Sequence, residues 1–269
     1  MRSATKSFRI FLPSPDVKQR LDHLLVARGL CDSREKGKRL ILAGDVLVND
    51  TPVTKAGQLI SEDAEIRVKA APKFVSRGGF KLEGALDHFG VNVEGRVCFD
   101  VGASTGGFTD CMLQRGAAKV FAFDVGTNQL VWKLRSDPRV VSRENYNVRH
   151  LKAEDIGEEV DLIVADVSFI SLTLVLPPAF QVLRRGGDAV VLIKPQFELS
   201  KEEIGRGGIV REGSLHQKAC DKIENFVKAQ PGWQWRGLME SPIQGTDGNR
   251  EYLAWISKER DLPSPVING

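Results

Sequence analysis

The sequence has few cysteines and no long apolar run, and both absences narrow the class of protein. The four cysteines among its 269 residues stand singly, without a Cys-x-x-Cys pair. This spacing indicates reduced thiols rather than a zinc site or a disulfide framework, so we expect no bound metal. No apolar run approaches the roughly 18 residues of a membrane span. The apolar run before Pro13 is too short for the core of a signal peptide, so we expect no membrane association and a cytoplasmic location.

The overall composition is ordinary. Hydrophobic residues make up 42% of the chain and charged residues 27%, which is typical of soluble globular proteins. Intrinsic disorder and a collagen-like fold are therefore excluded for the chain as a whole. At roughly 100–200 residues per domain, the length suits one large domain, alone or with a small one.

The net charge of +3 is distributed unevenly. Residues 1–75 contain 14 Lys and Arg against 9 Asp and Glu, a net charge of +5, whereas residues 76–269 contain 24 against 26, a net charge of −2. A basic segment that also folds is a candidate nucleic-acid surface. The alternative is a solvated basic face that binds nothing.

The first 70 residues have the pattern of a small α+β module. Asp16 can cap a helix that runs to about Arg28, with leucines along one face. Ser33 can cap a second helix that ends at Gly44. Two short strands are expected after these helices, over 45–50 and 65–69.

This basic segment resembles the αL RNA-binding module. The matching residues are R-L-D at 20–22, S-R at 33–34, the run I-L-A-G-D-V-L-V-N at 41–49, and Lys55. The resemblance implies salt-sensitive contacts with RNA phosphates that carry no sequence information. The residues that it places on the RNA are Arg20, Arg34, Lys38, Arg39 and Lys55. Each of them, taken singly, could instead be a solvated surface charge.

From residue 96 onward, apolar strands alternate with helices. Near-continuous apolar strands in this arrangement imply a parallel sheet covered by helices on both faces. Ligands of such sheets bind at the carboxyl ends of the strands. The strands are expected over 96–102, 119–125, 139–142, 161–169 and 188–195, with helices near Gly107 and over 172–183.

The first of these strands ends in a glycine loop, D-V-G-A-S-T-G-G-F at 100–108. Its spacing differs from the dinucleotide fingerprint G-x-G-x-x-G, and it resembles the first motif of class I S-adenosylmethionine-dependent methyltransferases. The resemblance implies S-adenosylmethionine as cofactor, and the alternative is a purely structural glycine turn. The cofactor-binding candidates in the loop are Asp100, Gly102, Ala103, Ser104, Thr105, Gly106, Gly107 and Phe108.

A second group of cofactor candidates follows later strands. Asp124 ends the second strand, where a carboxylate can accept hydrogen bonds from ribose hydroxyls. We add its neighbour Val125, and Asp166 at the end of the fourth strand. Asn145 follows the third strand and is a candidate for the adenine edge, although it could equally be a loop cap.

Two lysines and two carboxylates are the catalytic candidates. Lys81 lies in an expected helix over 76–86, and Lys194 ends the fifth strand, where the cofactor is expected. A lysine at the end of an apolar strand is costly to bury unless it is paired, and Asp166 is the obvious partner. Glu251 begins a late alternating strand. Lys81 could instead be a surface residue, and Glu251 could pair with a neighbouring cation.

The order Lys-Asp-Lys-Glu resembles the tetrad of FtsJ-like ribose 2′-O-methyltransferases, as do S-R-x-x-F-K-L at 76–82 and R-E-Y at 250–252. A 2′-hydroxyl must lose its proton as it attacks the sulfonium methyl group. Desolvation and a second cation can lower the pKa of a lysine enough to make it the base. The carboxylates would orient the amines. The resemblance favours Lys194 as the base, although the sequence itself does not separate the two lysines.

Together, the two parts resemble the TlyA (haemolysin A) family over residues 18–257, with further matching runs at 126–135, 164–172 and 192–198. The resemblance implies a Rossmann-like α/β fold with a parallel-rich, seven-stranded sheet, preceded by the RNA-binding domain. We expect domains at 1–70 and 76–269, joined by a linker at 71–75.

The family resemblance also implies a function. The expected reaction is 2′-O-methylation of a cytidine in 23S rRNA, and in some family members also in 16S rRNA. The expected partner is ribosomal RNA within ribosomal subunits, and the expected state is a monomer or weak homodimer. Two alternatives are an assembly factor that senses S-adenosylmethionine without catalysis, and a haemolysin.

Overall fold

The structure is a computed structural model that describes residues 17–69, 72–245 and 248–260. The chain divides into two compact units, Met1–Ala71 and Pro72–Gly269.

The small unit contains two helices and two small antiparallel sheets. One sheet pairs β1 with β4, and the other has the order β3-β2-β5. Leu21, Leu25 and Ile41 lie between the helices and the strands and are fully buried. The elements are β1 Lys18–Arg20, α1 Leu21–Ala27, α2 Arg34–Leu42, β2 Val46–Val48, β3 Thr51–Pro52, β4 Leu59–Ser61 and β5 Ile66–Val68.

The first helix begins later than the sequence pattern suggested. Residues 18–20 are extended because they pair with β4, with Lys18 opposite Ser61, so α1 begins only at Leu21. The expected cap Asp16 lies outside the described residues. The cap of the second helix is confirmed, since the Ser33 side chain accepts a hydrogen bond from the Lys36 N–H. The two expected strands are also present, as β2 and β5.

The large unit is built on one seven-stranded sheet with the order β11-β12-β10-β9-β6-β7-β8. The five strands from β10 to β8 are parallel to one another, and β12 and β11 are antiparallel additions. This confirms the Rossmann-like, parallel-rich sheet. The strands are β6 Val97–Val101, β7 Lys119–Phe123, β8 Val140–Arg143, β9 Val160–Ala165, β10 Leu183–Ile193, β11 Trp233–Glu240 and β12 Tyr252–Lys258.

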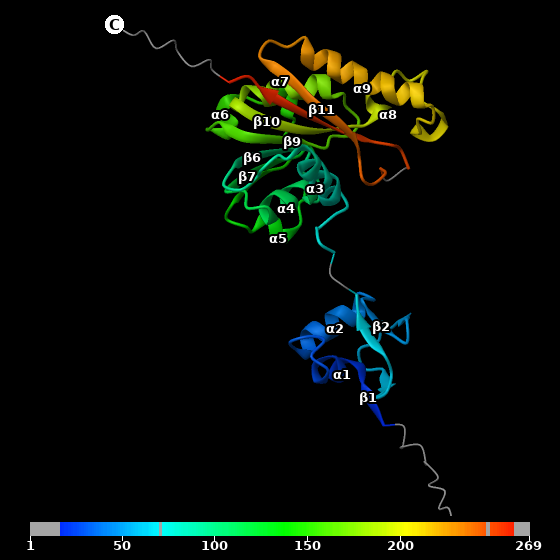
Figure 1. Cartoon of the computed structure of the whole chain (residues 1–269). Helices are drawn as coiled ribbons and strands as arrows, with labels where there is room; N and C mark the ends of the chain where they lie inside the picture. Colours follow the sequence, from blue (N-terminus) through cyan, green and yellow to red (C-terminus); the bar gives the residue numbers. More distant parts are fainter. Residues whose placement is uncertain (1–16, 70–71, 246–247, 261–269) are drawn as a thin grey trace, which may run out of the picture. The chain divides into compact units, whose positions relative to one another are not determined.

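Helices cover both faces of this sheet (Figure 1). One buried cluster joins α3, α4 and α5 to one face, and a second cluster joins α7 and α9 to the other. The core is therefore two apolar layers separated by the sheet. The helices are α3 Gly78–Phe89, α4 Gly107–Gln114, α5 Trp132–Arg135, α6 Ala153–Ile156, α7 Leu172–Gln181, α8 Pro195–Glu198 and α9 Gly213–Lys228, with 3-10 turns at Val148–His150 and Arg206–Gly208.

Two of the expected strands have different bounds in the structure. β9 ends at Ala165 rather than near 169, where its pairing with β6 and β10 ends, and Phe169 has a φ of +62°. β10 begins at Leu183 rather than 188, with an irregular pairing to β9 between Leu183 and Asp188. Asp166 directly follows β9 and therefore lies at the carboxyl edge of the sheet.

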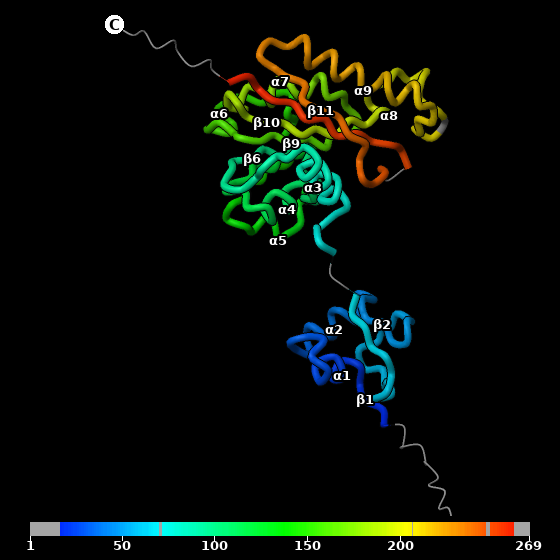
Figure 2. Tube along the Cα trace, in the orientation of Figure 1, coloured from blue at the N-terminus to red at the C-terminus, as the bar shows by residue number. Residues whose placement is uncertain are grey.

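The strand β12, the last one among the described residues, lies inside the sheet and not at its edge. Figure 2 shows β12 running between β10 and β11, and the register places Tyr252 opposite Ile193. This register places the residue before β12 at the same edge where β10 ends. Among the described residues, no helix is both long enough and apolar enough to span a membrane.

Candidate active site

Two adjoining cavities lie at the carboxyl edge of the large sheet. The first has a volume of about 440 Å³ and is lined by the glycine loop, by the start of α3 and by all four tetrad candidates. The second, of about 970 Å³, extends past Asp124 and Phe197. Gly102, Ser104 and Asp166 line both cavities. This edge is where the sequence pattern predicted a ligand.

The glycine loop connects β6 to α4 and packs tightly against the protein. Gly102 has a φ of +84°, and a Cβ there would lie 2.7 Å from the backbone oxygen of Asp166. Gly106 has a φ of +100°, and its Cβ would lie 2.2 Å from a methyl carbon of Leu134. Both positions therefore require glycine because of backbone conformation and close protein contacts. Ala103, Ser104, Thr105, Gly107 and Phe108 line the first cavity.

Asp100 lies beneath this loop and does not line either cavity. It is fully buried, and its Oδ2 accepts a hydrogen bond from the Thr109 hydroxyl at 2.6 Å. Its Oδ1 has no hydrogen-bond partner. Burial raises the pKa of Asp100 to about 7, although the bond from Thr109 opposes this shift. In this position Asp100 can act on a ligand only through the loop above it.

Asp124 stands at the end of β7 and lines the second cavity. Its carboxylate accepts hydrogen bonds from the backbone N–H of Ser104 at 2.8 Å and of Gly126 at 2.7 Å. Each carboxylate oxygen keeps a further lone pair for a ligand. The carboxylate is therefore held in place by the glycine loop and remains able to accept hydrogen bonds. Val125 beside it is exposed and lines the same cavity.

Asn145 is less well placed than its neighbours. It does not line either cavity, and its side-chain oxygen accepts a hydrogen bond from the Thr127 hydroxyl at 2.6 Å. Tyr146 and Asn147 line the second cavity instead. The sequence pattern located this loop at the end of the third strand but did not resolve which of its residues reaches the cavity.

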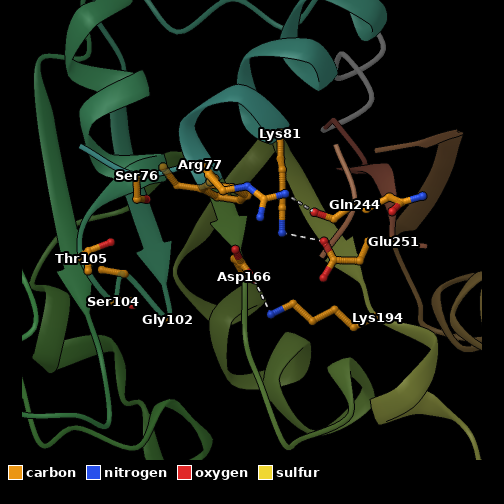
Figure 3. Close-up of a pocket in the computed structure, with 14 residues that line it drawn as sticks. Ser76, Arg77, Lys81, Gly102, Ser104, Thr105, Asp166, Lys194, Gln244 and Glu251 are labelled. Carbon is orange, nitrogen blue, oxygen red and sulfur yellow. Dashed lines mark hydrogen bonds and ion pairs between the residues drawn. The ribbon is translucent and has the colours of Figure 1, made fainter. Parts of the chain in front are cut away.

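The four tetrad candidates form two ion pairs in the first cavity (Figure 3). Lys81 Nζ lies 2.5 Å from Glu251 Oε2, and Lys194 Nζ lies 2.7 Å from Asp166 Oδ1. Lys81 lies in α3. Asp166 directly follows β9, Lys194 directly follows β10, and Glu251 directly precedes β12. The structure thus brings together four residues that are far apart in the chain.

The two pairs differ in burial and in partners. Lys81 and Glu251 are both buried, with 8% and 3% of their surfaces exposed. Lys194 has a second polar contact, a hydrogen bond of 2.9 Å from its Nζ to the Ser168 hydroxyl. A buried ammonium beside a second cation and two carboxylates is a site where charge can be stabilised away from water.

Four further residues line the first cavity without having been assigned a role from the sequence, namely Ser76, Arg77, Gly78 and Gln244. Ser76 and Arg77 lie at the start of α3, and Arg77 donates a hydrogen bond of 2.8 Å to the backbone oxygen of Gln244 (Figure 3). Ser76 and Arg77 stand in the matching run at 76–82, which was the available signal. No sequence signal indicated Gln244, because its hydrogen bond with Arg77 uses the backbone oxygen and not the side chain.

Two of the five RNA-binding candidates of the small unit, Arg20 and Arg34, bind the same carboxylate. Arg20 donates two hydrogen bonds to the buried Asp22, at 3.0 and 3.1 Å, and Arg34 donates a third at 3.3 Å. The bonds from Arg20, assisted by those from Arg34, lower the pKa of Asp22 to about 2. Lys38 pairs with Glu35 on its own helix, and Arg39 and Lys55 are exposed.

The cysteines are buried and unpaired throughout. Burial raises the pKa of the Cys98, Cys111 and Cys220 thiols to about 12, so they stay protonated and unreactive. Within the described ranges, no cluster of His, Cys, Asp and Glu side chains is arranged to hold a metal ion.

Comparison with known proteins identifies both units. The FtsJ-like methyltransferase model matches residues 74–258, and the S4 domain model matches residues 19–66. The chain is 45% identical over 246 residues to the 16S/23S rRNA (cytidine-2′-O)-methyltransferase TlyA of Mycobacterium tuberculosis, a match that covers 91% of each protein.

Two further relatives agree with this result. The 23S rRNA (cytidine-2′-O)-methyltransferase TlyA of Campylobacter jejuni is 35% identical, over 69% of this chain and 71% of that protein. A solved structure from Streptococcus thermophilus, named as a candidate hemolysin, is 46% identical, with a TM-score of 0.68 and coverage of 92% of both chains. The chain therefore belongs to the TlyA family of FtsJ-like methyltransferases, and it carries an S4 domain ahead of its methyltransferase domain.

Proposed function

We propose that this protein transfers a methyl group from S-adenosylmethionine to the 2′-hydroxyl of a cytidine in ribosomal RNA. The observation that carries the proposal is the pair of lysine–carboxylate contacts in the cavity that the glycine loop also lines. The choice of cytidine is supported by the two TlyA relatives, which are named for cytidine 2′-O-methylation, one in 16S and 23S rRNA and the other in 23S rRNA.

The residues around the two cavities fit S-adenosylmethionine. Asp124, fixed by two backbone N–H groups, suits the ribose hydroxyls, and the glycine loop at the start of α4 presents backbone N–H groups to a carboxylate. Val125, Val148 and Leu174 give the second cavity an apolar wall for the adenine ring. When bound, the cofactor supplies an electrophilic methyl group on a sulfonium centre.

The tetrad residues then have separate roles in our proposal. Lys194 accepts the proton of the 2′-hydroxyl, and Asp166 orients its amine. Lys81, held by Glu251 at 2.5 Å, remains a cation that stabilises the negative charge developing on the ribose oxygen. The cavity walls hold the hydroxyl close to the methyl group, which contributes to the rate through orientation.

The S4 domain supplies the RNA contacts in the same proposal. The basic side chains assigned to RNA phosphates are Arg20, Arg34, Lys38, Arg39 and Lys55, and Asp22 fixes the directions of the first two. Such contacts hold ribosomal RNA irrespective of its sequence and weaken as salt concentration rises. A cytoplasmic location and a monomeric or weakly dimeric state remain predictions from the sequence.

The proposal can be tested with purified ribosomal subunits and radiolabelled S-adenosylmethionine. We expect Lys194→Ala to lower methyl transfer by about 100-fold or more, because general base catalysis contributes at least this much. Cofactor binding, measured by calorimetry, should persist. Lys228→Ala is the matched control, because Lys228 is an exposed lysine in the last turn of α9 that pairs only with Glu224.

The other outcomes distinguish the alternatives. Label on rRNA that persists undiminished in Lys194→Ala would reject the role of the tetrad. Cofactor binding by the wild-type protein without transfer to either subunit would favour a non-catalytic assembly factor. Lysis of erythrocytes by the purified, lipid-free protein would favour the haemolysin that the name of the Streptococcus thermophilus relative suggests.

A further inference from the structure

We infer that Ser168 is a positioning residue for Lys194, an inference that rests on the proposed methyl transfer. In this inference the Ser168 hydroxyl accepts one N–H of the Lys194 amine, and the Asp166 carboxylate attracts the amine by its charge. The nitrogen lone pair is thereby directed into the cavity, toward the ribose hydroxyl. Neither the sequence pattern nor the family matches assign Ser168 a role.

The contacts of Lys194 Nζ support this arrangement. It donates a hydrogen bond to Ser168 Oγ at 2.9 Å, and Asp166 Oδ1 lies 2.7 Å away. The contact with Asp166 is an ion pair without an aligned hydrogen bond, since Oδ1 has no hydrogen-bond partner. The hydroxyl of Ser168 is therefore the acceptor that sets a direction for the amine. The Lys194 side chain is 11% exposed, whereas Ser168 is exposed.

The chemistry of a lysine base explains why a directional acceptor matters. An ammonium group has three N–H donors, whereas the neutral amine that accepts a proton has two N–H groups and one lone pair. If Ser168 holds one N–H group and the charge of Asp166 attracts the other, the lone pair occupies the remaining tetrahedral position. With Asp166 alone, the amine can rotate about its C–N bond and turn the lone pair away.

In the proposed reaction the O–H bond of the ribose breaks, its proton forms a third N–H bond on Lys194, and the oxygen keeps the electron pair. With S-adenosylmethionine bound, that pair would form the bond to the methyl group, and the bond from methyl to sulfur would break with its electrons left on sulfur. Lys81 differs from Lys194 because its one hydrogen bond described for Nζ goes to Glu251.

The segment that carries Ser168 is attached to the segment that carries Lys194 at a second point. Ser171 donates a hydrogen bond to Glu198 Oε2 at 2.6 Å, and Glu198 ends the short helix that follows Lys194. Between these two attachments, the rings of Phe169 and Phe197 lie 5.0 Å apart. The distance from Ser168 to Lys194 is therefore fixed by the packing of both segments.

Three variants test the inference. We expect Ser168→Ala to lower the single-turnover rate on ribosomal subunits by about tenfold or more, because a misdirected base loses much of its catalytic contribution. The dissociation constants for S-adenosylmethionine and for the subunit should change little. Ser168→Thr keeps the hydroxyl and should restore most of the rate.

Ser136→Ala is the matched control, because Ser136 belongs to the large unit and lines neither cavity. The hydrogen bonds described for its hydroxyl go to the backbone oxygens of Trp132 and Lys133. Their loss should lower the melting temperature, at a cost of about 1 kcal/mol, while leaving the rate close to that of the wild type. A purely structural role for Ser168 predicts the same behaviour in Ser168→Ala, and that result would overturn the inference. Equally slow Ala and Thr variants would overturn it as well.

A second measurement does not depend on turnover. In NMR spectra of protein labelled with [13Cε]lysine, the Lys194 signal can be assigned by its loss in Lys194→Arg. We expect this methylene group to become more mobile in Ser168→Ala but not in Ser168→Thr. An unchanged signal in Ser168→Ala would count against Ser168 even if the wild-type protein methylated no rRNA. The absence of methylation would itself reject only the proposed function.

Discussion

At the scale of single residues, Asp100 is the least expected feature of the structure. A carboxyl group in an unfolded chain has a pKa of about 3.9. In the folded protein, burial raises the pKa of Asp100 to about 7. The native state therefore binds more protons at this residue than the unfolded state between about pH 4 and pH 7, and the contribution of Asp100 to stability falls as pH rises through this range.

The variant Asp100→Asn tests this assignment. The amide is neutral at every pH and can still accept the hydrogen bond from Thr109. We expect the variant to gain stability relative to the wild type as pH rises from about 4 to about 7, by on the order of 3 kcal/mol. Urea unfolding at several pH values measures the difference. A difference that does not change with pH would show that Asp100 is ionised throughout.

Most of the tetrad could be predicted from the sequence, because Asp166, Lys194 and Glu251 each stand directly beside the end of a strand. Asp166 and Lys194 follow neighbouring parallel strands, so their proximity follows from the sheet order. The pairing of Lys81 with Glu251 could not be derived this way, because 170 residues separate them. The hydroxyl of Ser168 also escaped prediction, since its role depends on one hydrogen-bond direction.

At the scale of elements, the turn from β6 into α4 forms one wall of the first cavity. Gly106 precedes α4 with a φ of +100°, and the side chain of Leu134 from α5 occupies the space beside it. A side chain at this position would both strain the backbone and push against a buried leucine. The loop residues Ser104 and Thr105 would shift with it.

We expect Gly106→Ala to destabilise the protein by about 2–3 kcal/mol, since backbone strain of about 1–2 kcal/mol adds to the packing clash. It should also weaken the binding of S-adenosylmethionine. Gly95→Ala is the matched control, because Gly95 has a φ of +71° but no atom within 4 Å of the added carbon. Thermal unfolding and calorimetric titration give both quantities. Equal effects in the two variants would show that the contact with Leu134 is unimportant.

The elements predicted from the sequence were those with a strong local pattern. The strands β6, β7 and β9 were recognised because they are largely buried on both faces. The strand β1 was taken for helix because its extended form depends on pairing with β4, about 40 residues later. The strand β11 was not assigned, since it has no fully buried residue, and the helix α9 was missed although its buried residues recur at helical spacing.

At the scale of the whole molecule, the two units have separate hydrophobic cores. The core of the small unit includes Leu21 and Ile41, whereas the cores of the large unit lie on the two faces of its sheet. The candidate cofactor residues all belong to the large unit. A ligand that binds one folded unit stabilises that unit and not an independent neighbour.

We therefore expect scanning calorimetry to resolve two unfolding transitions, only one of which responds to S-adenosylmethionine. At a ligand concentration of about 100 times the dissociation constant, the larger unit should gain about 2.7 kcal/mol. Ser33→Ala, which removes the cap of α2, should lower the other transition alone. One cooperative transition that shifts as a whole would mean that the units unfold together.

The position of β12 has a consequence for when the enzyme becomes active during its synthesis. The strand β12 enters the sheet between β10 and β11, and the residue before it is Glu251. Until this segment has left the ribosome, the growing chain contains the glycine loop, Lys81, Asp166 and Lys194 but not Glu251, which pairs with Lys81. A nascent chain therefore cannot assemble the complete tetrad before Glu251 and β12 have emerged and joined the sheet.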